Sequence, residues 1–188
     1  PTHRMTAPAE TSAPPARSVS ADDRPPTVRA GIDPDEFRAV LGRFATGVTV
    51  LTTVDAGGRD HGMTVSAFCS LSLDPPLVLA CVDHGATMHD MLAEGAPLGV
   101  NVLAAGQEAL SRRFASGDPP KRFEGIGYQR GAQGAPLLDD VLAWLDCRVV
   151  ARHPGGDHTI VVARVEGAGI NAERPLLYYR SGYATLER

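Results

Sequence analysis

The residues best suited to hold a ligand are short hydroxyl side chains that recur at every second position from residue 64 to residue 73. One side of this alternation consists of Thr64, Ser66, Phe68, Ser70 and Ser72. The other side consists of Val65, Ala67, Cys69, Leu71 and Leu73. Successive residues of a β-strand point to opposite faces of a sheet, so the pattern predicts one continuous strand with one buried face. Its hydroxyl face has two interpretations: the solvent side of an antiparallel sheet, or a floor that a flat polar ring approaches closely.

Two other patterns could bind a phosphate group. Residues 87–94 are predicted to form a short helix with Thr87 as N-cap, preceded by Gly85 and Ala86, and a helix N-terminus offers free N–H groups to an anion. Arg112 and Arg113 lie together in a second predicted helix, residues 107–115, and a guanidinium can bind phosphate through two hydrogen bonds. Each pattern alone is also typical of a solvated surface. Together with the hydroxyl strand, they favour an aromatic ligand that carries phosphate.

His153 and His158 flank a glycine turn that also contains Asp157, which raises the question of a metal site. Hairpin geometry gives no reason for these side chains to converge, and we predict no metal. The sequence contains no G-x-S-x-G element of a serine hydrolase and no G-x-G-x-x-G element of a dinucleotide-binding βαβ unit.

The elements around these residues are mostly short strands. Asp33 is predicted to cap a helix whose apolar face is formed by Phe37, Val40, Leu41 and Phe44 and which ends at Gly47. Strands are predicted at residues 48–54, 64–73, 77–82, 98–103, 142–151, 158–165 and 175–179, with a long surface excursion at 116–136. Short strands joined by hairpin turns, with few helices, favour a mainly β fold: a closed antiparallel barrel with peripheral helices.

Composition limits the class of protein. The chain has 188 residues, 43% of them apolar and 21% charged, which fits one globular domain. A net charge of -4 and the lack of a basic patch argue against nucleic acid, and no apolar run has the length of a membrane span. The three cysteines, Cys69, Cys81 and Cys147, are expected to be buried apolar residues in a reducing cytoplasm. Residues 1–31 are predicted to be a flexible tail and residues 32–188 the folded domain.

Several segments, in order, carry a resemblance to a known family. They are F-R-A-V-L-G-R-F-A-T-G-V-T-V at 37–50, G-M-T-V-S-A-F-C-S-L-S-L-D-P-P-L-V at 62–78, N-V-L at 101–103, G-G-D-H at 155–158 and P-L-L-Y-Y-R at 175–180. Over residues 33–186 the chain resembles the flavin reductase family of two-component flavin-dependent monooxygenases. The resemblance implies a split antiparallel β-barrel (flavin reductase-like), a homodimer, and flavin bound near the subunit boundary.

The resemblance also assigns expected roles by position. The flavin ring and ribityl chain are expected against Thr64, Val65, Ser66 and Ala67. The ribityl phosphate is expected near Cys81, Val82, Asp83, Thr87 and Met88, and the phosphate or adenylate end near Arg113 and Phe114. The nicotinamide cofactor is expected at Gly156, Asp157 and His158, with His158 as the catalytic residue. Gly85 and Ala86 depart from the family pattern, in which a serine and a basic residue are common.

The function implied is that of an NAD(P)H:flavin oxidoreductase. It would use NADH or NADPH to reduce FAD or FMN by hydride transfer and would supply reduced flavin to a separate monooxygenase. Two alternatives remain: a split-barrel flavoprotein with tightly bound flavin that acts on its own substrate, and a non-enzymatic flavin carrier. The carrier would not need the G-D-H element, so the presence of that element favours the reductase.

Overall fold

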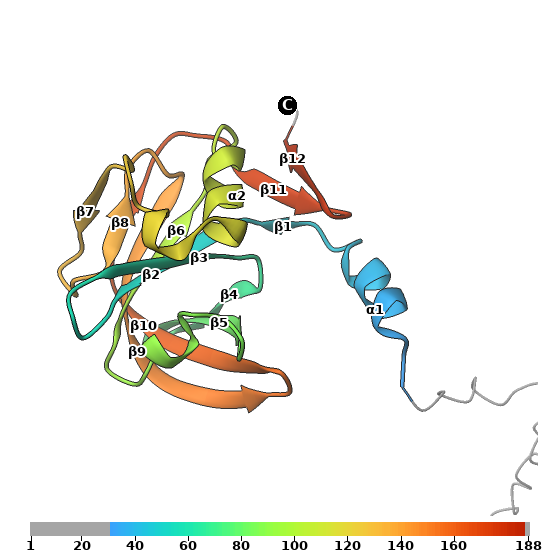
Figure 1. Cartoon of the computed structure of the whole chain (residues 1–188), viewed down its shortest axis with the longest axis horizontal. Coiled ribbons are helices and arrows are strands. Elements are labelled where there is room, and N and C mark those ends of the chain that lie inside the picture. Colours follow the sequence, from blue (N-terminus) through green and yellow to red (C-terminus); the bar gives the residue numbers. More distant parts are fainter. Residues whose placement is uncertain (1–30, 187–188) are drawn as a thin grey trace, which may run out of the picture.

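The computed structural model describes residues 31–186, and its centre is a seven-stranded antiparallel sheet (Figure 1). Its strands follow one another in the order β3-β2-β6-β9-β10-β5-β4. Their bounds are β2 Thr49–Val54, β3 Asp60–Val65, β4 Phe68–Leu73, β5 Pro76–Asp83, β6 Pro97–Val102, β9 Ala143–Gly155 and β10 His158–Ile170. The two outermost strands, β3 and β4, are consecutive in the chain. Because so short a link joins its two edges, the sheet must curl on itself, which confirms the predicted split barrel.

Two smaller sheets and the helices surround this barrel. One small sheet consists of β1 (Thr46–Gly47), β11 (Leu176–Tyr179) and β12 (Gly182–Thr185), and the other of β7 (Tyr128–Arg130) and β8 (Pro136–Leu138). The α-helices are α1 (Pro34–Leu41) and α2 (Glu108–Ser116), and two single 3-10 turns are η2 (His89–Met91) and η3 (Pro119–Lys121). Neither α-helix of residues 31–186 is long and apolar enough to cross a bilayer. The tail predicted at residues 1–31 lies, apart from Gly31, outside the described residues.

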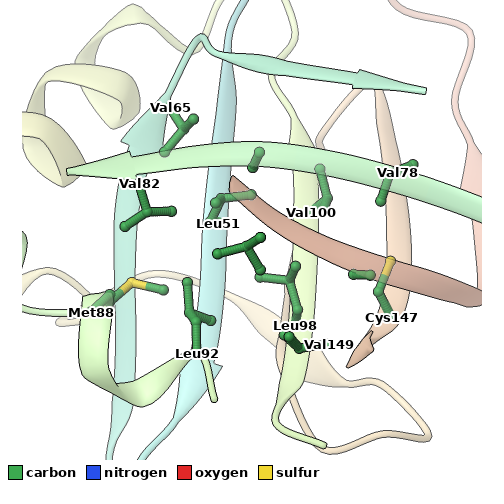
Figure 2. Packing of buried hydrophobic residues seen from close by; sticks show 13 residues of the cluster. Leu51, Val65, Val78, Val82, Met88, Leu92, Leu98, Val100, Cys147 and Val149 are labelled. Atoms are coloured by element: carbon green, nitrogen blue, oxygen red, sulfur yellow. The ribbon is translucent and has the colours of Figure 1, made fainter. Parts of the chain in front are cut away.

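The core fills the inside of the curled sheet, where apolar side chains from strands far apart in sequence meet (Figure 2). Leu51, Val82, Leu98 and Val149 are almost completely buried there. A second cluster, centred on Phe114, packs α2 against β2 and the 123–128 loop. Cys147 lies in the first cluster, and its burial raises the pKa of its thiol to about 12. Burial of this cysteine was predicted correctly, but Cys69 is exposed and that prediction was wrong.

The N-terminal helix begins as predicted and ends earlier. Oδ1 of Asp33 accepts the N–H groups of Asp35 and Glu36 at 2.9 and 3.3 Å, which is the expected N-cap. The helix stops at Leu41, not at Gly47. The N–H of Arg180 donates a hydrogen bond to the carbonyl of Gly42 at 2.9 Å, and the chain then turns into β1. The apolar face predicted for this helix is uncovered, with side chains between half and three-quarters exposed: Phe37, Val40, Leu41 and Phe44.

The continuous strand predicted for residues 64–73 is broken in two. β3 ends at Val65 and pairs with β2, whereas β4 begins at Phe68 and pairs with β5. At the break, the N–H of Phe68 donates to Ser66 O and that of Cys81 to Ala67 O, both at 3.0 Å. The predicted buried face holds only at its start, because Val65 is buried but Leu73 is 95% exposed.

The helix predicted at residues 87–94 reduces to η2, a single turn. The side chain of Thr87 does not cap it; Thr87 lies in the preceding turn. Met88 and Leu92, four residues apart, both enter the core, and the N–H of Gly95 is taken by Val149 O at 2.8 Å. These tertiary contacts hold the segment in a conformation that does not allow a second helical turn. The helix N-terminus on which the predicted phosphate site depended is therefore absent from this segment, and that part of the prediction was wrong.

The remaining predicted strands are confirmed by β2, β5, β6, β9, β10 and β11. Two features were not predicted. The predicted 116–136 excursion includes β7 and the first residue of β8, whose residues are buried, and a further strand, β12, follows β11.

Candidate functional site

A cleft of about 230 Å³ lies where β3, α2 and the β11–β12 hairpin meet; we call it the central cleft. Its lining consists of Val48, Thr64, Ser66, Ser111, Ala115, Tyr178 and Tyr183. Two of the hydroxyl residues of the predicted floor, Thr64 and Ser66, therefore line a cleft. The other two, Ser70 and Ser72, belong to β4, which is the opposite edge strand of the sheet and pairs with β5.

Hydrogen bonds fix the walls of the central cleft. Oγ1 of Thr64 donates to the carbonyl of Ser111 at 2.7 Å, which ties β3 to α2. Oγ of the buried Ser111 lies 2.8 Å from the hydroxyl of Tyr183, which ties α2 to β12. The ring of Tyr183 meets that of Tyr178 edge to face at 5.4 Å. The cleft thus combines short hydroxyls on one side with aromatic rings on another, and its parts are held by three separate elements.

A second cleft, of about 250 Å³, adjoins the first and shares Thr64 and Ala115 with it; we call it the Arg122 cleft. Four of its lining residues, Gly85 to Met88, come from the turn after β5, and Phe114 comes from α2. The residues predicted near a phosphate, Thr87 and Met88, thus lie beside the predicted flavin floor. The side chain of Met88 itself is 2% exposed and belongs mostly to the core.

The cation of this cleft is Arg122, which was not predicted. Its Nη1 donates to Gly62 O at 2.7 Å and its Nε to Gly117 O at 3.1 Å. Burial lowers the pKa of its guanidinium, which still stays charged near neutral pH because the ordinary value is so high. With two nitrogens committed to backbone carbonyls, Nη2 is the group most able to bind an anion in the cleft.

Arg113, the predicted phosphate-side arginine, is directed elsewhere. Its Nη2 donates to the carbonyls of Lys121 and Glu124 at 2.7 and 2.5 Å, so the side chain braces the loop after α2. Phe114, predicted beside it, lines the Arg122 cleft and is completely buried. The helix therefore turns Phe114 toward the cleft and Arg113 toward the loop. Arg113 contacts the loop in this structure, and its phosphate role stays a prediction.

A third cleft, of about 290 Å³, shares Ser66 with the central cleft, and we call it the Phe44 cleft. It is lined by the 44–47 segment together with Thr49, Ser66, Phe68 and Val102. Oγ1 of Thr46 is buried and has no hydrogen-bond partner among residues 31–186. A buried hydroxyl without a partner is costly, so a water molecule, a ligand or another chain is expected to supply one.

The predicted nicotinamide element, Gly156 to His158, forms the tip of the β9–β10 hairpin. Gly156 has φ +75°, the left-handed conformation that glycine adopts without strain. His158 pairs across the sheet with Asp83, and the N–H of His84 donates to Asp157 O at 3.0 Å. The tip therefore lies next to the turn that leads into the Arg122 cleft, although the three clefts themselves are lined by other residues.

His158 and Asp157 are hydrogen-bonded to each other at this tip. Nδ1 of His158 lies 2.7 Å from Oδ1 of Asp157, and the side chain of His158 is 40% exposed. This contact with His158 holds the pKa of Asp157 below its ordinary value. A carboxylate that stays ionised keeps a proton on Nδ1 and leaves Nε2 of the exposed ring to face a ligand.

The side chains of most remaining predicted site residues do not line the three clefts. Val65 and Val82 belong to the core, Cys81 is half-buried, and Ala67 is at the strand break. The carboxylate of Asp83 accepts the N–H of Gly85 at 2.6 Å and so shapes the turn of the Arg122 cleft. The arrangement as a whole fits a flat polar ring on hydroxyls and aromatic rings, with a phosphate at Arg122.

Comparison with known proteins gives a consistent result. The family model described as "Flavin reductase like domain" matches residues 41–187. A flavin reductase of Pseudomonas putida is 41% identical over 157 residues, which are 83% of this chain and 92% of the relative. The reductase subunit HsaB of a flavin-dependent monooxygenase from Rhodococcus jostii is 43% identical, over 83% of this chain and 80% of its own.

A solved structure is similar as well. The NADH:FAD oxidoreductase SgcE6 of Streptomyces globisporus C-1027, in complex with NAD and FAD fragments, is 37% identical, with a TM-score of 0.77. The match covers 83% of this chain and 96% of that chain.

Proposed function

Since the chain belongs to the flavin reductase family, we propose that it is an NAD(P)H:flavin oxidoreductase that reduces free FAD or FMN and supplies the reduced flavin to a separate monooxygenase. The observation that carries the proposal is the central cleft, in which Thr64 and Ser66 face the rings of Tyr178 and Tyr183. The Streptomyces relative is named for NADH, which supports NADH over NADPH as the reductant.

The residues of this chain bind and orient the two nucleotides. Flavin and nicotinamide supply the hydride chemistry themselves when both are bound. Thr64 to Ala67 would form the floor under the flavin ring, where exposed N–H groups and hydroxyls can stabilise the charge that develops on it. Thr87 and Met88, with Asp83 shaping their turn, would flank the ribityl phosphate, and Arg122 would neutralise that phosphate. No acid or base from the protein is needed.

His158 is proposed to orient the nicotinamide. Asp157 fixes its ring through Nδ1, and Gly156 gives the turn its shape. An imidazole ring held in this way would raise the rate of hydride transfer by aligning the nicotinamide with the flavin, because the donor and acceptor atoms must be in near contact.

A homodimer is the second part of the proposal. The face of α1 formed by Phe37, Val40, Leu41 and Phe44 is exposed, and the Phe44 cleft beside it holds the hydroxyl of Thr46, which has no partner within residues 31–186. An apolar face of this kind beside a cleft marks an interaction surface. Sedimentation should give twice the chain mass of 19.8 kDa at micromolar concentration, and a monomer would contradict the dimer.

Flavin titration tests the function. A reductase that hands its product to another protein must release flavin in every turnover, so we expect a Kd for oxidised flavin on the order of micromolar. The dialysed protein should oxidise NADH only when flavin is added, with saturable dependence on flavin concentration.

Two results of that titration would contradict the proposal. Flavin that survives dialysis, with a rate indifferent to added flavin, would identify a flavoprotein with its own substrate. Flavin binding without NADH or NADPH oxidation would identify a carrier. Because the enzyme's reductant is metabolic NADH, the predicted cytoplasmic location stays part of the proposal.

A further inference from the structure

The imidazole of His89, in the single turn η2, belongs to a polar network that the proposed function does not use. Its side chain is 16% exposed, and Met88 and Leu92 on either side of it enter the core (Figure 2). Nε2 of the ring lies 2.9 Å from Nη2 of Arg152 on β9 and 2.8 Å from Oγ1 of Thr159 on β10. The ring therefore joins η2 to both strands of the β9–β10 hairpin.

The contact with Arg152 fixes the protonation state of this ring. A guanidinium has donors and no acceptor, so Nε2 of His89 has to accept the hydrogen bond and carries no proton. The proton of the neutral ring is then on Nδ1, which donates to Oδ1 of Asp90 at 2.8 Å. Nη2 of Arg152 also donates to the carbonyl of His89 at 3.3 Å. Arg152 thus holds both the side chain and the backbone of the same residue.

Arg152 belongs to the part of β9 that extends past the end of its neighbour β6. The pairing of β9 with β6 runs from Ala143 to Arg148, where it meets the first residue of β6. Within residues 31–186, β9 has no sheet partner on this side beyond Arg148. The side chain of Arg152, four residues nearer the hairpin tip, supplies a link to η2 at a point where the sheet supplies none.

The same network reaches the residue next to His158. Thr159 is 8% exposed and lies on the same side of β10 as Val161 of the core. Successive residues of a strand point to opposite faces, so His158 points the other way. Holding Thr159 therefore fixes the backbone from which His158 projects. On the other side of His158, the carbonyl of Asp157 accepts the N–H of His84 at 3.0 Å, so both neighbours of His158 are held.

We propose that Arg152 and His89 are positioning residues for hydride transfer: their contact holds the β9–β10 hairpin, and with it His158, in place for the nicotinamide, provided that His89 is neutral. The inference rests on the proposed reductase function. A proton taken up at Nε2 of His89 removes the acceptor and places a positive charge beside Arg152. The new Nε2–H then donates to Oγ1 of Thr159, and Arg152 is released. Histidine side chains change charge between about pH 5 and 8, so the contact depends on pH.

The charged and titratable groups around His89 come from three elements. Arg152, on β9, repels a positively charged ring. Asp90, in η2 itself, attracts one, but its side chain is 96% exposed, so water screens the attraction. The ring of His84, in the turn after β5, meets that of His89 edge to face at 5.0 Å and would add a second positive charge at low pH. From β10 the ring meets the uncharged hydroxyl of Thr159. The contact between Arg152 and His89 is therefore present at high pH and is lost as the pH falls.

Steady-state kinetics with NADH tests the positioning role. Arg152→Met keeps the apolar stem and removes the donors. It should lower kcat/KM for NADH about tenfold, the scale of one charge-assisted hydrogen bond, and leave the KM for flavin within about twofold of wild type. Arg152→Lys keeps a charged donor and should recover part of the loss. In a His158→Ala background, Arg152→Met should lower kcat/KM by less than about twofold, because the effects of residues that act as one unit do not add.

Arg148→Met is the matched control. Arg148 lies on the same strand and donates to the carbonyl of Gly95 at 2.8 Å, so its loss also removes a bond between β9 and the segment after η2. It should lower the melting temperature and leave kcat/KM for NADH within about twofold of wild type.

His89→Gln isolates the pH dependence, because a glutamine carbonyl can accept from Arg152 at every pH and takes up no proton. Between pH 8 and pH 6, kcat/KM for NADH should fall about threefold more in the wild type than in His89→Gln. The comparison removes the titration of His158, which both proteins share.

The outcomes separate the two proposals. If the wild type oxidises neither NADH nor NADPH, the reductase function fails, and hydrogen exchange of residues 150–158 then tests the contact without turnover. Exchange there should be faster in Arg152→Met than in Arg148→Met, and equal rates overturn the positioning role. If oxidation occurs and Arg152→Met costs as much in the His158→Ala background as alone, the arginine does not act through His158 and the proposal is overturned. A pH profile that His89→Gln leaves unchanged overturns the requirement for a neutral His89.

Discussion

Replacing Arg122 by methionine tests which arginine binds the flavin phosphate. The substitution keeps the apolar stem of the side chain and removes its charge and its donors. Two effects follow and have to be separated: loss of the bonds to the carbonyls of Gly62 and Gly117, and loss of the cation in the Arg122 cleft.

The two effects have different magnitudes. Two backbone hydrogen bonds contribute about 1–3 kcal/mol to stability. A charge-assisted hydrogen bond to a phosphate contributes about 1.5–3 kcal/mol to binding, which corresponds to a Kd for FMN raised about ten- to a hundredfold. Riboflavin has no phosphate, so its Kd should stay within about twofold of wild type.

Arg113→Met is the matched control. Arg113 also donates to two backbone carbonyls, those of Lys121 and Glu124 in the loop after α2, but it does not line the clefts described above. Its loss should lower the melting temperature about as much as that of Arg122 and leave the Kd for FMN nearly unchanged. Fluorescence titration of FMN and riboflavin against both variants measures this difference.

Two results would refute the reasoning. If Arg122→Met weakens the binding of riboflavin as much as that of FMN, the arginine acts through the shape of the cleft and not through a contact with the phosphate. If Arg113→Met weakens FMN selectively, the phosphate lies at the residue predicted from the sequence.

Three further outcomes are expected. Ser66→Leu should abolish flavin binding while the circular dichroism spectrum and melting stay near wild type; loss of folding would instead make Ser66 structural. His158→Ala should lower kcat/KM for NADH by about tenfold or more, roughly 1.4 kcal/mol of transition-state stabilisation, with flavin affinity little changed; an unaltered NADH dependence would remove His158 from the site. Gly62→Ala should reduce the free energy of unfolding in urea by about 1–3 kcal/mol, because its Cβ would lie 2.5 Å from the buried ring of Phe114; an unchanged midpoint would contradict this packing.

Much of the strand content was predictable because the strands of a closed sheet are buried and apolar. The apolar runs at residues 77–82 and 98–103 predict strands, and they correspond to β5 and β6, whose apolar side chains enter the core. The cap at Asp33 was predictable for a local reason, since its carboxylate binds N–H groups two and three residues ahead.

The break at Ser66 could not be predicted from the alternation. A period of two reports that the backbone is extended, but it does not report which strand lies alongside. β3 and β4 are both extended, so the pattern runs through the change of partner without interruption. The short η2 turn was missed for a related reason, because burial of Met88 and Leu92 is a tertiary effect.

The candidate site was predicted in part. Thr64, Ser66, Thr87, Met88 and Phe114 line the clefts, although their ligand contacts stay predictions. The tyrosines of the central cleft, Tyr178 and Tyr183, and the cation Arg122 were assigned no role. They come from the C-terminal hairpin and from a loop rich in glycine and proline, which only the fold brings beside β3.

The two residues between β3 and β4 have a mechanical consequence for the whole barrel. Ser66 and Ala67 join opposite edges of the seven-stranded sheet, so a covalent tether, and not a ladder of hydrogen bonds, holds those edges in proximity. Any flattening of the sheet pulls on this tether, and any tension in it acts on Ser66. The floor of the central cleft is therefore coupled to the curvature of the barrel: a change that separates the two edge strands acts on the binding surface through this two-residue link.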